Sequence, residues 1–242
     1  MIKSLSIIFP VFNEELRLKP SFSHITNFLK KKKKFKTEII FIDDGSKDNS
    51  YNLIEKFIKK IKRNNKINIK VVRSKNNLGK GHALKLGVKK AKYDWILTTD
   101  VDISVSLFQF LDWTKKKLIT KKYLVYFGSR SHKKSIVKKK FIRDVLGNIM
   151  RFFVSTILDI KIKDTQCGYK LYKKRIAKVI FSKMKNYGFD HDLELILILK
   201  SKNVIIKELP VKWVHKDNSQ LNIFWDPVKM LLEIFTIKLR YL

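Results

Sequence analysis

The sequence Trp95-Ile96-Leu97-Thr98-Thr99-Asp100-Val101-Asp102-Ile103-Ser104 decides which fold we expect. It is an apolar, β-prone run that ends in two aspartates one residue apart. Side chains at i and i+2 of an extended strand point the same way, so Asp100 and Asp102 are expected to present oxygens to one point. Such a pair suits a hard divalent cation, Mg²⁺ or Mn²⁺. A plain turn after the strand would show the same acids, so the neighbouring segments must decide.

Three earlier apolar runs also end in polar residues. They are 5–11, followed by Phe12-Asn13-Glu14-Glu15; 38–42, followed by Asp43-Asp44-Gly45-Ser46-Lys47-Asp48; and 67–72, followed by Asn76-Asn77-Leu78-Gly79-Lys80-Gly81-His82-Ala83-Leu84. Apolar residues at helical spacing predict helices over about 20–29 and 50–61, and a third after the glycines. Alternating strands and helices predict an α/β fold with a mainly parallel sheet and helices on both faces. Ligands bind at the carboxyl edge of such sheets.

The residues at this edge carry the chemistry of a nucleotide site. Asp43 and Asp44 can accept hydrogen bonds from a base or ribose, whereas Asp48 is expected to cap the following helix. Lys80 stands between two glycines ahead of a helix, where it can offset phosphate charge. The segment is not a Walker loop, because no Ser or Thr follows the lysine.

Composition limits the remaining possibilities. The 242 residues suffice for one α/β domain, and the formal net charge of +33 suits a polyanionic partner: nucleic acid, an anionic lipid surface or a phosphorylated substrate. Cys167 is the single cysteine, so no intrachain disulfide can form. The chain opens on a strand-like run, and no apolar stretch reaches the roughly 20 residues of a spanning helix. These features predict a cytoplasmic protein.

Four of these segments together resemble the nucleotide-sugar-dependent glycosyltransferases of family 2, which have the GT-A fold. The matching segments are 10–15, 43–48, 77–84 and 100–102. Later segments resemble the polyprenyl-phosphate sugar transferases of that family, above all the dolichyl-phosphate β-glucosyltransferases: Gly128-Ser129-Arg130, Asp164-Thr165-Gln166-Cys167-Gly168-Tyr169-Lys170-Leu171, Asp192-Leu193-Glu194-Leu195 and 238–242. The resemblance covers nearly the whole chain and implies a single GT-A domain, with a nucleotide-sugar half over about 1–105, an acceptor half over about 106–221 and an amphipathic helix over 222–242.

The resemblance implies roles for individual residues. The nucleotide-sugar pocket would be lined by Pro10, Val11, Asn13, Glu14, Asp43, Asp44, Lys80 and Asp100, and Asp100 and Asp102 would hold the metal. Some relatives have a glutamine ligand where this chain has Ser104, a poorer ligand. The alanine usual between the two acids is Val101, and a lysine usual near the end of the domain is Gln220.

On the acceptor side, the resemblance points to a lipid phosphate. Arg130 and Arg143 are the expected phosphate-binding residues, because a guanidinium binds phosphate bidentately. Asp164 and Gln166 would shape this side, although capping and turn formation would explain them as well. Asp192, with Glu194 as the alternative, would be a catalytic base or contact a sugar hydroxyl; pairing with lysines would look the same. Cys167 is expected to be a packing residue.

The implied reaction is inverting transfer of a hexose, with glucose from UDP-glucose expected, to a dolichyl or undecaprenyl phosphate. That phosphate is already ionised, so no strong general base is needed, and the metal and cationic side chains stabilise the leaving diphosphate. The alternatives are a GDP-mannose-dependent polyprenyl-phosphate mannosyltransferase and a family 2 transferase that acts on a saccharide hydroxyl.

Two amphipathic segments, 145–160 and 227–242, are expected to lie in the membrane interface, helped by lysines drawn to anionic headgroups. Both could instead be core helices. The expected location is peripheral, on the cytoplasmic face of a membrane, where a separate membrane protein would use or flip the product. The alternative of a different class is a basic nucleic-acid-binding protein. Scattered lysines, the lack of a nucleic-acid motif and acids clustered at strand ends favour the enzyme.

Overall fold

The computed structural model describes residues 2–32, 35–64, 68–138, 156–188, 191–215, 236–237 and 239–241, without the side chains of 63 and 64. The strands are β1 (Ser4–Val11), β2 (Lys36–Asp43), β3 (Asn68–Arg73), β4 (Trp95–Thr98), β5 (Val125–Ser129), β6 (Ile136–Lys138), β7 (Lys170–Lys173), β8 (Ile206–Pro210) and β9 (Lys212–Val214). The helices are α1 (Glu15–Lys31), α2 (Ser50–Asn64), α3 (Lys80–Lys90), α4 (Phe108–Lys115), α6 (Lys174–Lys183) and α7 (His191–Ser201).

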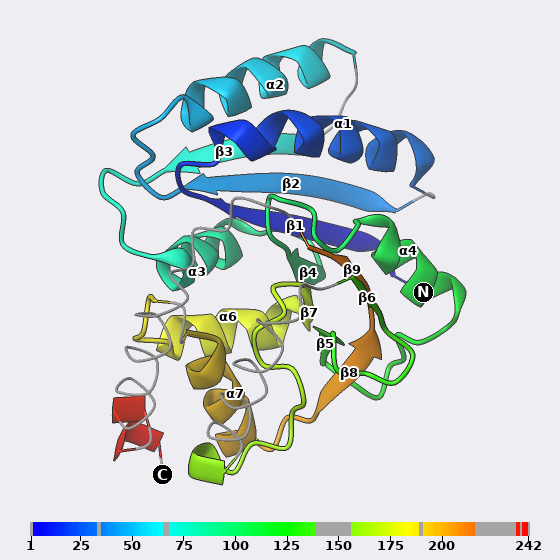
Figure 1. The fold of residues 1–242 in the computed structure, drawn as a ribbon, viewed down its shortest axis with the longest axis vertical. Helices are drawn as coiled ribbons and strands as arrows, with labels where there is room; N and C mark the ends of the chain where they lie inside the picture. The colour runs from blue at the N-terminus through cyan, green and yellow to red at the C-terminus, as the bar shows by residue number, and fades with distance from the viewer. Residues whose placement is uncertain are drawn as a thin grey trace.

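One seven-stranded sheet organises the described residues, in the order β3-β2-β1-β4-β7-β5-β8 (Figure 1). All its pairs are parallel except those of β7, which runs antiparallel to β4 and β5. A second, two-stranded sheet joins β6 and β9. The predicted mainly parallel α/β sheet is confirmed. The strand order reverses at β1, between β2 and β4, and open sheets of this kind bind ligands beside such a reversal.

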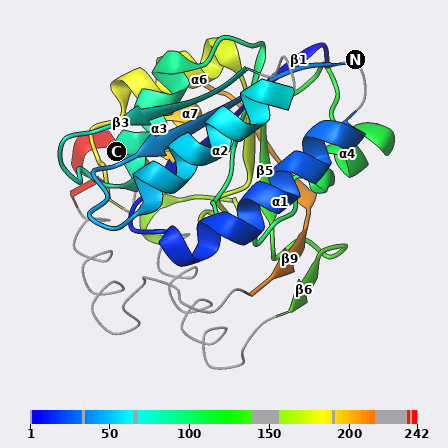
Figure 2. The ribbon, with the colours of Figure 1, turned by 90° about the horizontal axis from the view of Figure 1, so that it is seen from above.

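Alternate residues of the central strands divide the core into two layers, as expected for strands that are buried on both faces. Leu5, Ile7 and Phe9 of β1 pack with residues of α1, α2 and α4. Ile8 faces the other way and packs with residues of α3, α6 and α7. Figures 1 and 2 show α1 and α2 on one face of the sheet and α3, α6 and α7 on the other, which confirms the predicted covering of both faces.

Helix α1 begins at Glu15, earlier than the start near residue 20 that the apolar spacing predicts. The Glu14 carbonyl accepts from the Arg17 and Leu18 amides, and the Asp48 carboxylate accepts from the Glu15 amide at 3.1 Å. A cap from the turn after β2 therefore starts the helix, and Pro20 lies inside it. The predicted capping role of Asp48 is confirmed, since its other oxygen accepts from the amide of Ser50, the first residue of α2.

Strand β4 ends at Thr98, so the prediction that strand geometry aligns Asp100 and Asp102 is wrong. The two acids lie in a turn in which the Ile103 amide donates to the Asp100 carbonyl at 3.3 Å, and Ile103 has a φ of 55°. Val101 between them is buried, and its carbonyl accepts from the Ser21 hydroxyl of α1. Packing of this turn on α1, rather than alternation along a strand, places the carboxylates.

Several predictions fall outside the described residues: Arg143, Gln220 and most of 145–160 and 227–242. In the described ends of these two segments, Leu158, Ile160 and Ile237 are buried in the core layer of α3, α6 and α7. These ends follow the core alternative, and the interface prediction stays a prediction for the rest. Among the described helices, none combines the length and apolar character needed to cross a bilayer.

Candidate active site

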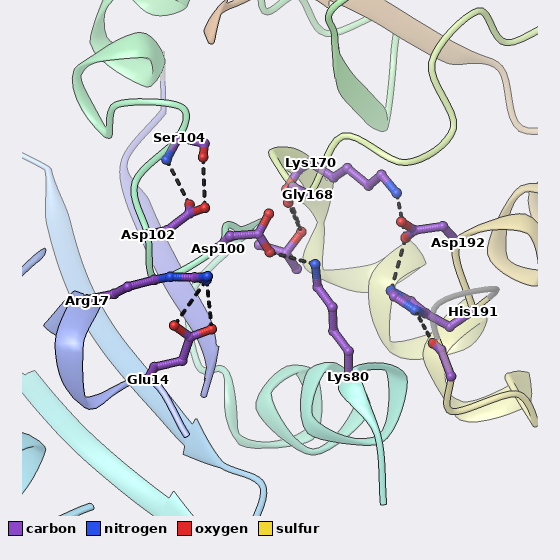
Figure 3. Close-up of polar contacts among 12 residues, drawn as sticks. Glu14, Arg17, Lys80, Asp100, Asp102, Ser104, Gly168, Lys170, His191 and Asp192 are labelled. Atoms are coloured by element: carbon purple, nitrogen blue, oxygen red, sulfur yellow. Dashed lines mark hydrogen bonds and ion pairs between the residues drawn. The ribbon is translucent and has the colours of Figure 1, made fainter. Parts of the chain in front are cut away.

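The carboxyl ends of β1 and β4 meet the start of α3 at one small cavity. Its walls bring together residues that are far apart in the sequence: Pro10, Lys80, Leu84, Thr98, Thr99, Asp100, Gly168, Lys170, Tyr172, Phe181, His191 and Asp192. Of the predicted site residues, Pro10, Lys80, Asp100 and Asp192 share this cavity. Figure 3 shows the polar contacts around it.

Lys80, the first residue of α3, reaches the turn after β4. Its Nζ lies 2.6 Å from Oδ1 of Asp100 (Figure 3). Burial alone would lower the pKa of Lys80, but the carboxylates of Asp100, Asp192 and Asp102 outweigh it and raise that pKa, so the lysine is charged. The Asp100 side chain remains 40% exposed and open to a ligand.

Asp102 is held by Ser104. The Ser104 amide donates to Oδ1 and the Ser104 hydroxyl to Oδ2, both at 2.8 Å. Each carboxylate oxygen has a further lone pair, so these contacts orient Asp102 without closing it to a ligand. Ser104 thus supports the acid.

Glu14, just before α1, adds a third acid to this edge. Its carboxylate lies 3.2 Å from Arg17. Burial raises the pKa of Glu14 to about 7; Arg17 lowers that pKa, and the negative charges of Asp102 and Asp100 raise it. The edge therefore gathers three carboxyl groups beside Lys80 and Arg17, and a bound cation would relieve the unfavourable interaction of Asp102 and Asp100 with Glu14.

The donor set fits a hard cation. Asp100 and Asp102 supply carboxylate oxygens, which Mg²⁺ and Mn²⁺ prefer. Within the part of the chain that the structure describes, no three His, Cys, Asp or Glu side chains form a complete metal site. The fit is that of a cation held by two carboxylates, with ligand oxygens and water completing its shell, as is usual when Mg²⁺ binds substrate phosphates.

Asp43 is the last residue of β2, Asp44 follows it, and both are buried. Oδ2 of Asp43 lies 3.1 Å from Nε of Arg73, an ion pair without hydrogen-bond alignment. Oδ1 of Asp43 accepts a weak hydrogen bond from the Ser46 backbone amide at 3.3 Å. Asp44 accepts from the Gly79 amide at 2.7 Å and from the Leu78 amide at 3.1 Å. Asp44 therefore ties the turn after β2 to the loop that carries Lys80.

The turn after β1 is fastened to the same region. Asn13 has a φ of 51°, its Oδ1 accepts from the Lys47 amide at 2.8 Å, and its own amide donates to the Ser46 hydroxyl at 3.0 Å. Val11 is buried in the core layer of α1 and α2. The turns after β1 and β2 thus form one unit at the carboxyl edge.

On the predicted acceptor side, Arg130, an expected phosphate-binding residue, pairs with Asp164. Arg130 Nε and Nη2 donate to the two oxygens of Asp164 at 2.8 Å, and the Arg130 amide donates to the same carboxylate at 2.7 Å. Despite burial, Asp164 holds the pKa of Arg130 above its usual range. Three further N–H donors of the guanidinium lie outside this pair.

Gln166 lies two residues beyond Asp164, and its exposed side chain stays a prediction as an acceptor residue. The backbone amide of Gln166 donates to Asp164 Oδ1 at 3.3 Å, which agrees with the alternative that these two residues form a turn. Cys167 is buried, and burial, with the charge of Asp164 as a smaller cause, raises the pKa of its thiol to about 12. The thiol is protonated and packed, as predicted.

Sequence reasoning missed a buried network around Asp192. Lys170 Nζ lies 2.5 Å from Asp192 Oδ1, donates to the Thr165 carbonyl at 2.9 Å and is 2% exposed. His191 Nε2 is 3.1 Å from the same oxygen without hydrogen-bond alignment, and its Nδ1 contacts the Gly188 carbonyl at 2.7 Å. Burial would raise the pKa of Asp192, but His191 and Lys170 hold that pKa well below its usual range.

Asp192 is therefore an ionised acid paired with a lysine, the alternative that the sequence left open. The signal for Lys170 was its place between Tyr169 and Leu171 on a buried strand, where a charge needs a partner. Gly168 leaves room for the Asp100 carboxylate, because a Cβ there would lie 2.4 Å from Oδ2 of Asp100.

A mainly parallel sheet that gathers a glycine-flanked lysine and paired aspartates at its carboxyl edge defines a nucleotide-dependent α/β transferase of the GT-A type. The fold matches a solved structure of glucosyl-3-phosphoglycerate synthase from Mycobacterium tuberculosis in complex with Mn²⁺, UDP-glucose and phosphoglyceric acid, with a TM-score of 0.65. That match has 14% identity and covers 98% of this chain and 80% of that one.

The chain belongs to glycosyl transferase family 2, whose model matches residues 6–181. It is 34% identical to the dolichyl-phosphate beta-glucosyltransferase of Dictyostelium discoideum, over 98% of this chain and 75% of that one. It is 31% identical to the human protein of the same name, over 99% of this chain and 76% of that one. The predicted family and the prediction of a glycosyltransferase are confirmed.

Proposed function

We propose that this glycosyltransferase moves glucose from UDP-glucose to dolichyl phosphate or a related polyprenyl phosphate, with inversion at the anomeric carbon. The observation that carries the proposal is the similarity to dolichyl-phosphate beta-glucosyltransferases, which extends through both the donor edge and the segment from Asp164 to Lys170. In this proposal, residues 1–105 form approximately the half that binds the nucleotide sugar, and residues 106–221 form approximately the half that binds the acceptor.

The donor binds at the carboxyl edge of β1, β2 and β4. Asp43 and the turn of Asn13 receive the nucleoside, with Pro10, Val11, Glu14 and Asp44 shaping the pocket. Lys80 at the N-terminus of α3 receives the diphosphate, because a helix N-terminus and a cation both favour negative charge. The Lys80–Asp100 contact of 2.6 Å keeps that lysine charged and directed into the site.

Asp100 and Asp102 would hold Mg²⁺ or Mn²⁺, and the ion supplies positive charge for the leaving diphosphate. Ser104 holds Asp102 in place for this purpose. Lys80 stabilises the same developing charge directly, at no cost of reorganisation, because it is already oriented.

The acceptor phosphate binds at Arg130, together with Arg143. Asp164 fixes the fork of Arg130 so that its remaining donors face the phosphate, and Gln166 lies at the rim. The phosphate oxygen attacks while the sugar–diphosphate bond breaks, and no proton has to be removed from an ionised phosphate. Asp192, paired with Lys170, serves as a fixed negative charge opposite Lys80 and contacts the sugar rather than acting as a strong base.

The protein would work at the cytoplasmic face of a membrane that holds the lipid. Segments 145–160 and 227–242 would lie at that surface, where lysines favour an anionic leaflet. A separate membrane protein would then use or flip the glycolipid.

The direct test is transfer of label from UDP-glucose to lipid. Purified protein is incubated with dolichyl-phosphate vesicles, labelled UDP-glucose and Mg²⁺, and organic-extractable label is measured. We expect labelled lipid that mild acid releases as glucose. Label only from GDP-mannose would favour the mannosyltransferase alternative, and label only on a soluble saccharide would favour the hydroxyl-acceptor alternative. Either outcome would overturn the proposal.

A further inference from the structure

Glu194 of α7 is fully buried and has no part in the proposed chemistry. Its Oε2 accepts from the amides of Lys185 and Asn186 at 2.9 and 2.7 Å. Its Oε1 accepts from the Tyr241 hydroxyl at 2.7 Å and, more weakly, from Arg240 Nη1 at 3.4 Å. One carboxylate thus joins the loop between α6 and α7 to the last described residues of the chain.

The loop of residues 184–188 packs in turn against the start of α3. The Tyr187 carbonyl accepts from the Gly81 amide at 2.8 Å, and the Met184 carbonyl accepts from Lys85 Nζ at 2.7 Å. Gly79 has a φ of 104°, and a Cβ there would lie 2.3 Å from the Tyr187 carbonyl oxygen. Two glycines beside Lys80 are therefore needed for contact with this loop.

We infer that Glu194, Arg240 and Tyr241 form a clamp that positions the 184–188 loop and, through it, the first turn of α3 for the donor diphosphate. This inference rests on the proposed function, which assigns that turn to the diphosphate. The three are positioning residues, since none of them lines the cavity at Asp100.

The clamp follows from the needs of a buried carboxylate. An ionised carboxylate without water is stable only when donors satisfy its oxygens. The pKa of Tyr241 is raised to about 12, mainly by burial and secondly by the hydrogen bond to Glu194. Its hydroxyl is therefore protonated at neutral pH and can donate. Arg240 strengthens the same link, because its Nη1 also donates to Asn186 Oδ1 at 3.1 Å.

The clamp can be opened without detaching the segment that carries it. Ile237 is fully buried in the core layer of α3, α6 and α7, independently of the Tyr241 hydroxyl. Tyr241→Phe removes only the hydroxyl and keeps the ring. Tyr93→Phe is the matched control, because Tyr93 precedes β4, at the end of the strand opposite Asp100.

The experiment measures three quantities for wild type, Tyr241→Phe and Tyr93→Phe: the Kd for UDP in Mg²⁺ by calorimetry, KM and kcat with UDP-glucose, and hydrogen exchange of the 184–188 amides. For Tyr241→Phe we expect about fivefold weaker UDP binding, a similar rise in KM, kcat within about twofold of wild type and faster exchange at Lys185 and Asn186. The control should match wild type. Arg240→Ala should shift the same quantities in the same direction.

A merely structural role would lower the melting temperature and leave the Kd for UDP unchanged. That result would overturn the clamp while leaving the proposed function intact. Unchanged hydrogen exchange of the 184–188 amides in both Tyr241→Phe and Arg240→Ala would do the same. Wild-type protein that binds neither UDP nor UDP-glucose would overturn the proposed function, and the inference with it.

Discussion

Two regions differ in how their charged side chains are paired: the donor edge, which carries Glu14, Asp100 and Asp102, and the acceptor segment, which contains Arg130 and Asp164. At the donor edge, three carboxyl groups, Glu14, Asp100 and Asp102, lie close together, and burial, with smaller contributions from the two aspartates, raises the pKa of Glu14 to about 7. In the acceptor segment, Asp164 is closed into a bidentate pair with Arg130. The difference supports the two proposals made above: the edge with Asp100 and Asp102 takes up a cation, and the Arg130 guanidinium, already oriented by Asp164, takes up the acceptor phosphate.

The largest effect is expected from Asp102→Ala, which removes one of the two carboxylates proposed to hold the metal. We expect glucosyl transfer to fall by at least about 100-fold with the fold retained. Initial rates at several Mg²⁺ concentrations, together with thermal unfolding, test this. Asp94→Ala, at the opposite end of β4, is the control. Near-wild-type transfer by Asp102→Ala would remove the metal assignment.

The variant Asp164→Asn tests the role of the Arg130–Asp164 pair in the acceptor segment. Without its full charge the Arg130 fork loses its orientation, and we expect KM for the polyprenyl phosphate to rise about tenfold while KM for UDP-glucose stays the same. Because Arg130 is partly exposed, the loss of stability should be about 2 kcal/mol, less than for a fully buried pair. Kinetics with each substrate varied in turn decide the point. An equal rise in both KM values would contradict the separation of the two regions.

The burial of Glu14, which is the main cause of its raised pKa, predicts a pH dependence. The folded protein binds the Glu14 proton more tightly than the unfolded chain, so the contribution to stability is complete below about pH 4 and is lost as the pH rises through about 7. Glu14→Gln cannot titrate. In metal-free buffer, wild type should lose about 3 kcal/mol relative to this variant between pH 4.5 and 7.5. Denaturant unfolding at several pH values measures this, and parallel curves would argue against a raised pKa.

The smallest effect is expected from Ser104→Ala. The variant loses the hydroxyl bond to Asp102 but keeps the amide bond. We expect the Mg²⁺ concentration for half-maximal transfer to rise about threefold, below the usual range for residues that orient metal ligands, because one contact remains. A titration of activity against Mg²⁺ is sufficient. No change would mean that the backbone alone orients Asp102.

The outcome for individual residues shows where sequence reasoning works. The strand end at Val11 and, within one residue, that at Asp43 followed from apolar runs, whereas the end of β4 at Thr98 did not. The placement of Lys80 and Asp100 at one edge followed from parallel strands that share a carboxyl edge. The turn geometry of Asp100 and Asp102 did not follow, because it depends on packing against α1. The early start of α1 depends on Asp48, which lies in a different turn.

The sequence by itself determined the α/β class, the edge that carries the chemistry, and the family, because all three depend on local periodicity and on short motifs in a fixed order. Only the tertiary structure decided the partners of the charges: Arg130 with Asp164, Lys170 with Asp192, and Glu194 with Tyr241. A buried charge is stable only beside its partner, and that partner is chosen by how the layers pack. No local pattern records that choice.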